Sequence, residues 1–350
     1  MSSSPTAWEA WLDAEQVRAA RARSTADTAR LRAELRACLR LDTAPVRSAQ
    51  PPVRQSAAPI AGRPVTRLVV QVWAGCQMDA LSIEGEPGRP RLLLLHELDG
   101  SPEIMLATPL AAVLAQAGFG LLAPRLPAGW PVRLRLARKA RLLGLEWLGL
   151  EVLALSRLMD QVPSSGWGAV GYSRGGQAAM LLAALEPRVR AVVVASWFCD
   201  RDKRLLDTND SRLLAFLDSP EDEQFLPGWS RRFDDGALAA LIAPRPLLVT
   251  SGLDDPILPF ELVQDAFGAA QQAYRAAGAL GRVRLSLLPG GHLPQAEETA
   301  GWLTAQLAPE VDLSALPTTL RSRHLARRLG LARRNRLRRL APGTHRRRKH

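Results

Sequence analysis

The sequence predicts an α/β domain in which helices cover both faces of a mostly parallel, twisted sheet, with a helical extension before it and a basic tail after it. Short apolar segments rich in β-branched residues alternate with helical patterns over residues 65–312, as is typical of parallel sheets. Apolar residues make up 47% of the 350-residue chain, which is ample for a sizeable core. A glycine-rich turn between a strand pattern and a helix pattern, at residues 171–176, fits the same class.

Residues 1–43 predict one or two amphipathic helices. Helix formers predominate there, and apolar side chains recur at roughly helical spacing. These side chains are Trp8, Trp11, Val17, Leu31, Leu35 and Leu39. Residues 44–64 contain five prolines among Ser, Ala and Gln. Because proline offers no backbone N–H, this composition predicts an extended linker ahead of the domain at 65–312.

Seven segments of the domain have the composition of strands. They are residues 65–73, 91–96, 118–124, 167–172, 189–196, 244–250 and 282–289. Between residues 197 and 242 the alternation lapses into a polar, acid-rich stretch. We expect this stretch to form a cap-like or lid-like insertion.

The charge of the chain is concentrated at one end. The formal net charge is +12 and the isoelectric point is about 11.0, yet thirteen of the 46 Lys and Arg residues and no Asp or Glu lie between residues 321 and 350. The remainder is therefore close to neutral. We expect residues 313–350 to be a disordered tail or a basic amphipathic helix that contacts an anionic surface or nucleic acid.

Several features favour a cytoplasmic protein. The N-terminus lacks a basic start followed by an apolar core and a small-residue cleavage site. The most apolar long stretch, residues 142–159, is interrupted by Glu146, Glu151 and Arg157, so we expect no transmembrane segment. Three widely spaced cysteines, none in a Cys-x-x-Cys pair, fit a reducing compartment.

The strongest local signal is Gly171-Tyr172-Ser173-Arg174-Gly175-Gly176, which follows an apolar strand pattern and precedes a helix pattern. A serine at such a sharp turn needs small neighbours two residues before and after it, and its hydroxyl points outward above the sheet. The start of the helix supplies backbone N–H groups and a positive dipole end for a developing oxyanion. Ser173 is therefore the candidate nucleophile, and the Arg174 N–H is the first candidate donor of an oxyanion hole.

Only two histidines, His96 and His292, lie outside the basic tail. His292 follows the last predicted strand on a Pro-Gly-Gly loop, so we expect it to be the general base. The candidate acid is Asp255, which completes the chain order Ser, Asp, His. Asp254 is expected to face solvent or cap the turn. Weaker alternatives for the acid, after the preceding strand, are Asp200 and Asp202.

Three segments together resemble dienelactone-hydrolase-like and acetyl-xylan-esterase-like α/β-hydrolases. They are residues 171–176, residues 241–259 and the loop Gly290-Gly291-His292. Most telling is the Ala-Pro-Arg-Pro strand followed by Gly-x-x-Asp-x-x-x-Pro. The resemblance covers residues 65–308, and the Trp-containing N-terminal helices resemble those of the esterase branch. It implies an α/β-hydrolase fold with Ser173 as nucleophile, Asp255 as acid and His292 as base.

The resemblance also implies a second oxyanion donor on the loop of residues 95–100. There the Leu98 N–H would act together with the Arg174 N–H, and His96 would be structural. His-Glu at positions 96 and 97 resembles dienelactone hydrolases, in which the nucleophile is commonly cysteine, whereas esterases usually have His-Gly. Because the chain departs from both branches, neither branch defines its substrate.

Two further side chains, Glu97 and Tyr172, are expected beside the site. A carboxylate at Glu97 close to Ser173 would oppose oxyanion formation or gate the hydroxyl. No phosphate-binding glycine loop and no set of acids and histidines at ligand spacing occurs in the body of the chain, so neither a cofactor nor a metal is expected.

The expected function is hydrolysis of carboxylic esters, with short acyl groups, through an acyl-enzyme on Ser173. A serine peptidase with the same fold is one alternative. A non-catalytic protein that works through its anion-binding tail is another, because a fold does not guarantee an activity. The oligomeric state is left open by the sequence.

Overall fold

The computed structural model describes residues 7–21, 27–43, 45, 50–207, 210, 216–294 and 296–315. The chain divides into two units, Met1–Leu313 and Ser314–His350. The fold described below is that of the first unit. Of the basic tail predicted at residues 313–350, residues 316–350 lie outside the described residues, and so does its predicted contact with an anionic partner.

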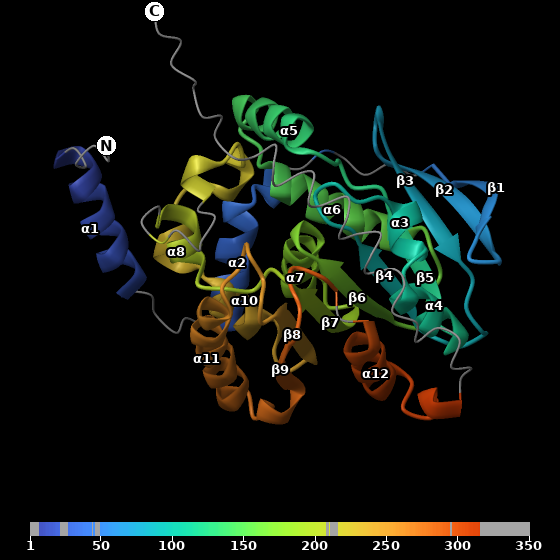
Figure 1. Ribbon diagram of the computed structural model, residues 1–350. Helices are drawn as coiled ribbons and strands as arrows, with labels where there is room; N and C mark the ends of the chain where they lie inside the picture. Colours follow the sequence, from blue (N-terminus) through green and yellow to red (C-terminus); the bar gives the residue numbers. More distant parts are fainter. Residues whose placement is uncertain are drawn as a thin grey trace, which may run out of the picture. The chain divides into compact units, whose positions relative to one another are not determined.

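Among the described residues, nine strands form a single sheet in the order β1-β2-β3-β5-β4-β6-β7-β8-β9 (Figure 1). The strands are β1 Val53–Ile60, β2 Arg63–Trp73, β3 Cys76–Ile83, β4 Arg91–Leu95, β5 Gly120–Pro124, β6 Trp167–Tyr172, β7 Val189–Ala195, β8 Leu247–Gly252 and β9 Val283–Leu288. The pairs β1–β2, β2–β3 and β3–β5 are antiparallel, and the pairs from β5 to β9 are parallel. The mostly parallel sheet predicted from the sequence is confirmed.

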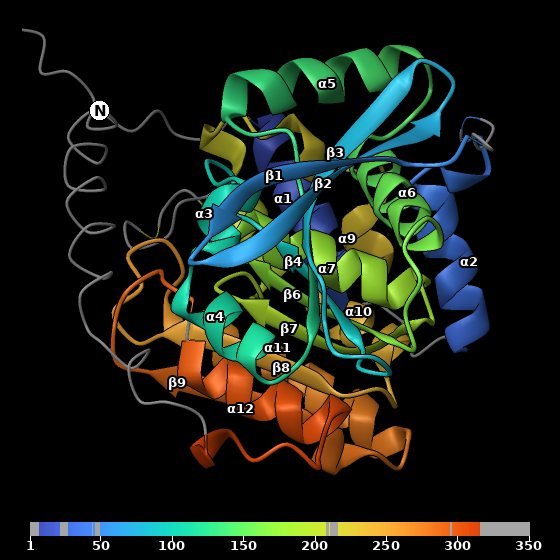
Figure 2. The ribbon, with the colours of Figure 1, turned by 90° about the vertical axis from the view of Figure 1, so that its right-hand side faces the viewer.

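Helices cover both faces of this sheet, as predicted. They are α1 Ala7–Arg21, α2 Thr28–Cys38, α3 Pro102–Leu106, α4 Pro109–Gln116, α5 Trp130–Leu142, α6 Trp147–Asp160, α7 Arg174–Leu185, α8 Arg201–Leu206, α9 Trp229–Arg232, α10 Asp235–Ile242, α11 Phe260–Ala276 and α12 Ala296–Leu307. Helices α4 and α12 contact each other on one face, and α6, α7, α10 and α11 form the layer on the other (Figure 2). Among the described helices, none combines the length and the apolar character that a membrane span requires.

The linker predicted at residues 44–64 is wrong over much of its length, because residues 53–60 form the edge strand β1. This strand is mostly exposed and pairs only with β2. Its proline, Pro59, lies where the register shifts between Ala57 and Ile60, a place that requires no ladder N–H from that residue. An edge strand thus tolerates the composition that suggested a linker.

The sequence predicts one or two N-terminal helices, and the described residues form two, α1 and α2. Helix α2 buries Leu31 and Leu35 and lies against α7 and α10. Arg32 of α2 donates hydrogen bonds to the carbonyl oxygens of Ala184 and Leu241. Helix α1, by contrast, leaves Trp11 54% exposed, so only the second helix contributes substantially to the core.

The stretch at 197–242 is more buried than its acidic composition suggested. Its described part contains α8, α9, α10 and short 3₁₀ turns, and it places Phe216, Trp229 and Phe233 in the core. Two of its acidic residues, Glu221 and Glu223, are 5% and 1% exposed. A cover over the active site by this stretch stays a prediction.

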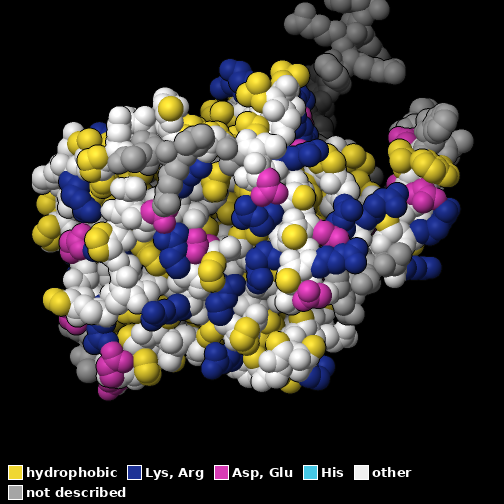
Figure 3. All heavy atoms as spheres, turned by 180° about the vertical axis from the view of Figure 1, so that it is seen from behind, with side chains coloured by type: hydrophobic (Ala, Val, Ile, Leu, Met, Phe, Trp, Pro, Cys, Tyr) yellow, Lys and Arg dark blue, Asp and Glu magenta, His cyan; other side chains and the backbone are white. Residues whose placement is uncertain are grey.

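On the surface of the described residues, positively and negatively charged side chains are interspersed. On the face seen in Figure 3, Lys and Arg side chains are scattered among acidic and apolar ones. Exposed pairs such as Arg67–Asp79 and Arg188–Asp160 connect neighbouring elements at 2.7 Å. Such exposed pairs each contribute at most about 1 kcal/mol to stability.

Candidate active site

Ser173 occupies a strained turn between β6 and α7. Its φ and ψ are 54° and −119°, a backbone conformation that residues other than glycine rarely adopt. Its N–H donates to the carbonyl oxygen of Ala195 at 2.8 Å, and its own carbonyl accepts from the N–H of Gly176 at 2.8 Å. These bonds hold the strained residue at the carboxyl edge of the sheet, where β6 ends.

Two glycines permit this turn. A Cβ atom at Gly171 would lie 1.9 Å from the carbonyl oxygen of Gly175, and one at Gly175 would lie 2.1 Å from the carbonyl oxygen of Leu95. Both distances are far below van der Waals contact, so each position excludes every larger residue. The small neighbours expected from the sequence are therefore required by close backbone approach.

The structure brings together the three side chains predicted to form the site. His292 Nε2 lies 2.9 Å from Ser173 Oγ, and His292 Nδ1 lies 2.7 Å from Asp255 Oδ2. Since a carboxylate can only accept, the Nδ1–H donates to Asp255, and Nε2 is left to accept a proton from the serine hydroxyl. His292 is 2% exposed and Asp255 is 7% exposed, so the hydrogen bond between them is screened from water, whereas Ser173 is partly exposed.

The loops that carry Asp255 and His292 are fixed against each other. The second carboxylate oxygen of Asp255 accepts from the N–H groups of Ile257 and Leu258, at 2.9 and 3.2 Å. A Cβ at Gly252 would lie 2.2 Å from the carbonyl oxygen of Gly290, so the two loops touch backbone to backbone. The acid and the base are thus held in place independently of any ligand.

Tyr172 secures the histidine loop from the other side. Its hydroxyl donates to the carbonyl oxygen of His292, and the two rings lie 5.3 Å apart at a tilt of 47°. Tyr172 is buried, with 6% exposed. It therefore supports the imidazole of His292, next to the site as expected.

The weaker candidates for the acid lie elsewhere. Asp254 is exposed, and its carboxylate accepts from the N–H of Gly290 at 3.4 Å. Asp200 caps α8 by accepting from the N–H of Lys203. Asp202 accepts from the side chain of Gln16 in α1 at 3.4 Å. Of the four aspartates considered, Asp255 is the one that the structure places against His292.

His96 is held in the interior of its loop. Nδ1 lies 2.7 Å from the carbonyl oxygen of Glu97, and Nε2 accepts from the N–H of Leu126 at 3.0 Å. These partners require the neutral imidazole protonated at Nδ1. Burial lowers the pKa of His96 and so favours the same form. Both ring nitrogens are used within the protein, as a structural residue requires.

The two candidate oxyanion-hole donors are the backbone N–H groups of Arg174, at the start of α7, and of Leu98, in the loop after β4. Arg174 is the first residue of α7, and N–H groups in the first turn of a helix have no intrahelical acceptor. Leu98 belongs to the loop after β4, and its carbonyl oxygen accepts from the N–H of Gly129 at 2.8 Å. Glu97 in the same loop is half-buried. Gly175, which approaches Leu95, brings the start of α7 against the start of this loop.

The surroundings of the Arg174 side chain could not be foreseen from the motif. The side chain is 3% exposed and pairs with Glu221, although the Gly-x-Ser-x-Gly motif does not specify this residue. The partner lies 47 residues further along the chain, in the acid-rich stretch. The one available signal was the density of acids at 221–223 in a chain whose residues outside the basic tail are close to neutral.

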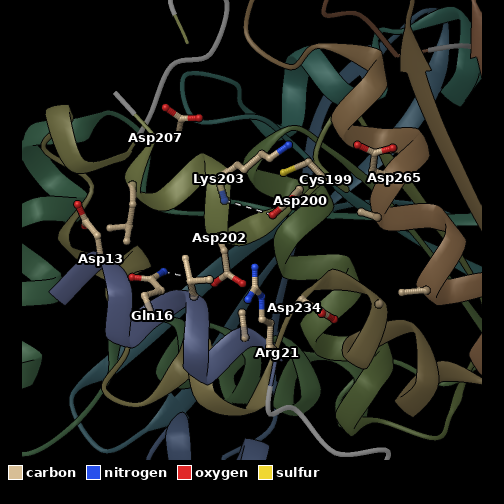
Figure 4. A pocket seen from close by; sticks show the side chains of 16 residues that line it. Asp13, Gln16, Arg21, Cys199, Asp200, Asp202, Lys203, Asp207, Asp234 and Asp265 are labelled. Atoms are coloured by element: carbon tan, nitrogen blue, oxygen red, sulfur yellow. Dashed lines mark hydrogen bonds between the residues drawn. The ribbon is translucent and has the colours of Figure 1, made fainter. Parts of the chain in front are cut away.

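A separate cavity of about 750 Å³ lies between α1 and helices α8 and α11. Its walls carry several carboxylates, among them Asp200, Asp202 and Asp265 (Figure 4). Neither Ser173 nor His292 lines it. Within the part of the chain that is described, no three His, Cys, Asp or Glu side chains form a group that could hold a metal ion.

The strand order, the strained turn after β6 and the loops after β8 and β9 define an α/β-hydrolase fold, as the sequence resemblance predicted. Residues 143–278 match the model of the Abhydrolase family, Abhydrolase_7. No curated protein sequence matches the chain significantly.

Solved structures share this fold at low sequence identity. Methylesterase BT1017 is 20% identical with a TM-score of 0.60, over 83% of this chain and 66% of that chain, which is just under two thirds of its length. A putative acetyl xylan esterase from Bacteroides fragilis is 15% identical with a TM-score of 0.57, over 74% of each chain. A glucuronoyl esterase from Caldicellulosiruptor kristjansonii is 17% identical with a TM-score of 0.53, over 77% of this chain and 82% of that one.

Proposed function

We propose that the protein is a serine hydrolase that cleaves carboxylic esters with short acyl groups. The single observation that carries the proposal is the continuous chain of hydrogen bonds from Asp255 through His292 to Ser173. The names of the structural neighbours, a methylesterase, an acetyl xylan esterase and a glucuronoyl esterase, agree with an ester as the substrate.

In the proposed reaction, His292 Nε2 takes the hydroxyl proton as Ser173 Oγ bonds to the acyl carbon. The carbonyl oxygen becomes an oxyanion, which accepts hydrogen bonds from the N–H groups of Arg174 and Leu98. The C–O bond to the alcohol then breaks, and His292 returns the proton to the departing alkoxide. Asp255 keeps Nδ1 protonated and stabilises the imidazolium without itself taking the proton.

The acyl-enzyme is resolved by the same groups. His292 removes a proton from water as the water oxygen bonds to the acyl carbon, and the second oxyanion is held by the same two N–H groups. Collapse of this intermediate releases the carboxylic acid and returns the proton to Ser173 Oγ. The reaction consumes one water per ester and needs no cofactor.

Hydrolysis of p-nitrophenyl acetate and butyrate, measured beside p-nitroanilide peptides, tests the proposal. We expect ester hydrolysis in the wild type, and its loss by at least about 10³-fold in Ser173→Ala. Ser251→Ala is the matched control, because its buried hydroxyl has no hydrogen-bond partner among the described residues. Faster turnover of amides would indicate a peptidase, and equal rates in wild type and Ser173→Ala would indicate a protein without this activity.

A further inference from the structure

The side chain of Arg174 turns away from solvent and into the protein beneath the nucleophile turn. One end of its guanidinium forms an ion pair with Glu221, and Nη1 donates to Gln177 Oε1 at 2.8 Å. The guanidinium carbon lies 4.7 Å from the ring centre of Trp197 and 5.6 Å from that of Phe216. The planar group is thus held both at its ends and at its faces.

Two of these four contacts, those with Glu221 and Phe216, come from residues 216–224, which are remote from α7 in sequence. Gln224 of this segment exchanges two hydrogen bonds with Gln177 of α7, at 2.8 and 3.1 Å. Phe216 stacks on Trp197 with ring centres 5.8 Å apart. Residues 216–224 are therefore fastened to the first turn of α7, directly behind Ser173.

The positive charge of Arg174 requires anionic partners, which residues 216–224 supply. Burial lowers the pKa of the Arg174 guanidinium, the carboxylate of Glu223 opposes that effect, and the nearby guanidinium groups of Arg133, Arg204 and Arg201 lower the pKa further. A buried cation without anionic partners is strongly destabilising. Glu221 and Glu223 of the segment supply negative charge that partly offsets this cost.

We propose, on the basis of the proposed function, that Arg174 is a positioning residue. Its side chain, held by Glu221, Trp197 and Phe216, fixes the position of its own backbone N–H, which donates a hydrogen bond to the oxyanion. The N–H and the side chain belong to the same residue, so a clamp on the side chain restricts the peptide unit directly after Ser173. Small displacements of an oxyanion donor are costly, because hydrogen bonds to the developing charge depend strongly on geometry.

The proposal predicts a loss in kcat rather than in KM. We expect Arg174→Met and Glu221→Gln to lower kcat by about 10- to 100-fold while KM changes by less than about threefold. Arg174→Lys keeps the charge but not the flat, forked group, and should recover part of the loss. The affinity for phenylboronic acid, which forms a tetrahedral adduct with a serine nucleophile, should fall in parallel with kcat/KM.

Glu151→Gln is the control for a general loss of stability. Glu151 is also buried, with 3% exposed, and pairs with Arg133 at 2.8 Å. Both Gln variants should lower the melting temperature, but Glu151→Gln should keep kcat within about twofold of the wild type. Equal losses of kcat in the two would reduce the role of Glu221 to stability alone and overturn the proposal.

Three further results would each overturn the role proposed for Arg174, the proposed function, or both. Folded Arg174→Lys and Glu221→Gln proteins with wild-type kcat overturn the proposal, and they decide the question even if Arg174→Met does not fold. Ester hydrolysis that is absent from the wild type would overturn the proposed function together with this inference. Wild-type hydrolysis that depends on Ser173 but is unchanged in the variants would overturn this inference alone.

Discussion

At the scale of the residue, the loop after β8 gives two adjacent aspartates different tasks. Asp255 is buried, and its two oxygens are divided between His292 and two backbone N–H groups. Asp254 is exposed and accepts from the N–H of Gly290. The Asp255 carboxylate therefore binds the imidazole of His292, and the Asp254 carboxylate stabilises the conformation of the loop.

This division predicts a large difference between two conservative substitutions. Asp255→Asn places an amide opposite His292 Nδ1 and favours the wrong tautomer, so kcat for ester hydrolysis should fall by roughly 10⁴-fold. Asp254→Asn should change kcat by less than about threefold, because the loop is also held by the contact between Gly252 and Gly290. Steady-state kinetics of both variants measure the difference, and comparable losses would refute the assignment.

The individual site residues were largely predictable from the sequence. Ser173 was recognisable because Gly171 and Gly175 flank it at a turn between a strand pattern and a helix pattern, and His292 because few histidines lie outside the tail. The support given by Tyr172 to the His292 carbonyl was not predictable, nor was the buried ion pair of Arg174. Those contacts depend on side chains that meet only after the chain has folded.

At the scale of the element, two glycines within helices show whether a glycine is required by close packing or only lowers the helix propensity. Gly268 lies within α11, where an added Cβ would meet nothing within 4 Å. Gly149 lies within α6, where an added Cβ would be 2.0 Å from the carbonyl oxygen of Leu39, at the end of α2. Gly149 thus allows the end of α2 to pack closely on α6 of the hydrolase domain.

Alanine at these two positions should therefore act in opposite directions. Gly268→Ala should raise the free energy of unfolding by about 0.5–1 kcal/mol, because alanine loses less backbone entropy in a helix. Gly149→Ala should lower it by about 1–3 kcal/mol through overpacking against backbone. Urea unfolding curves give both values, and a stabilised Gly149→Ala would contradict the close approach of α2 to α6.

The strands that the sequence missed are β1 and β3, which both pair antiparallel with the predicted strand β2. The central parallel strands β5 and β6 are buried throughout and appear as apolar runs, so composition alone indicates them. Strand β3 contains Gln77, Asp79 and Ser82, and β1 is mostly exposed. Such strands are defined by pairing across a hairpin and at the sheet edge, which local hydrophobicity does not reveal.

At the scale of the whole molecule, buried charge couples stability to pH. Asp235 in α10 is fully buried, and burial raises the pKa of its carboxyl to about 6, although Arg201 opposes the increase. In the unfolded chain the same group titrates near pH 4. The folded state therefore binds the proton more tightly than the unfolded state does.

The sign of this linkage gives a prediction. The stabilisation from the protonated carboxyl is complete below about pH 4 and is lost as the pH rises through about 6. The free energy of unfolding of the wild type, relative to Asp235→Asn, should fall by on the order of 3 kcal/mol between pH 4 and pH 7. Urea unfolding across this range measures it, and a constant difference between the two proteins would exclude the linkage.

The central claim for the whole molecule is that His292 activates Ser173 for nucleophilic attack. Reaction of the intact protein with a fluorophosphonate, followed by mass spectrometry of its peptides, tests this most directly. We predict one adduct on the peptide that contains Ser173, absent from Ser173→Ala and formed at least about 10³-fold more slowly in His292→Ala. A folded wild type that leaves Ser173 unmodified, or a His292→Ala variant that reacts at the wild-type rate, would contradict it.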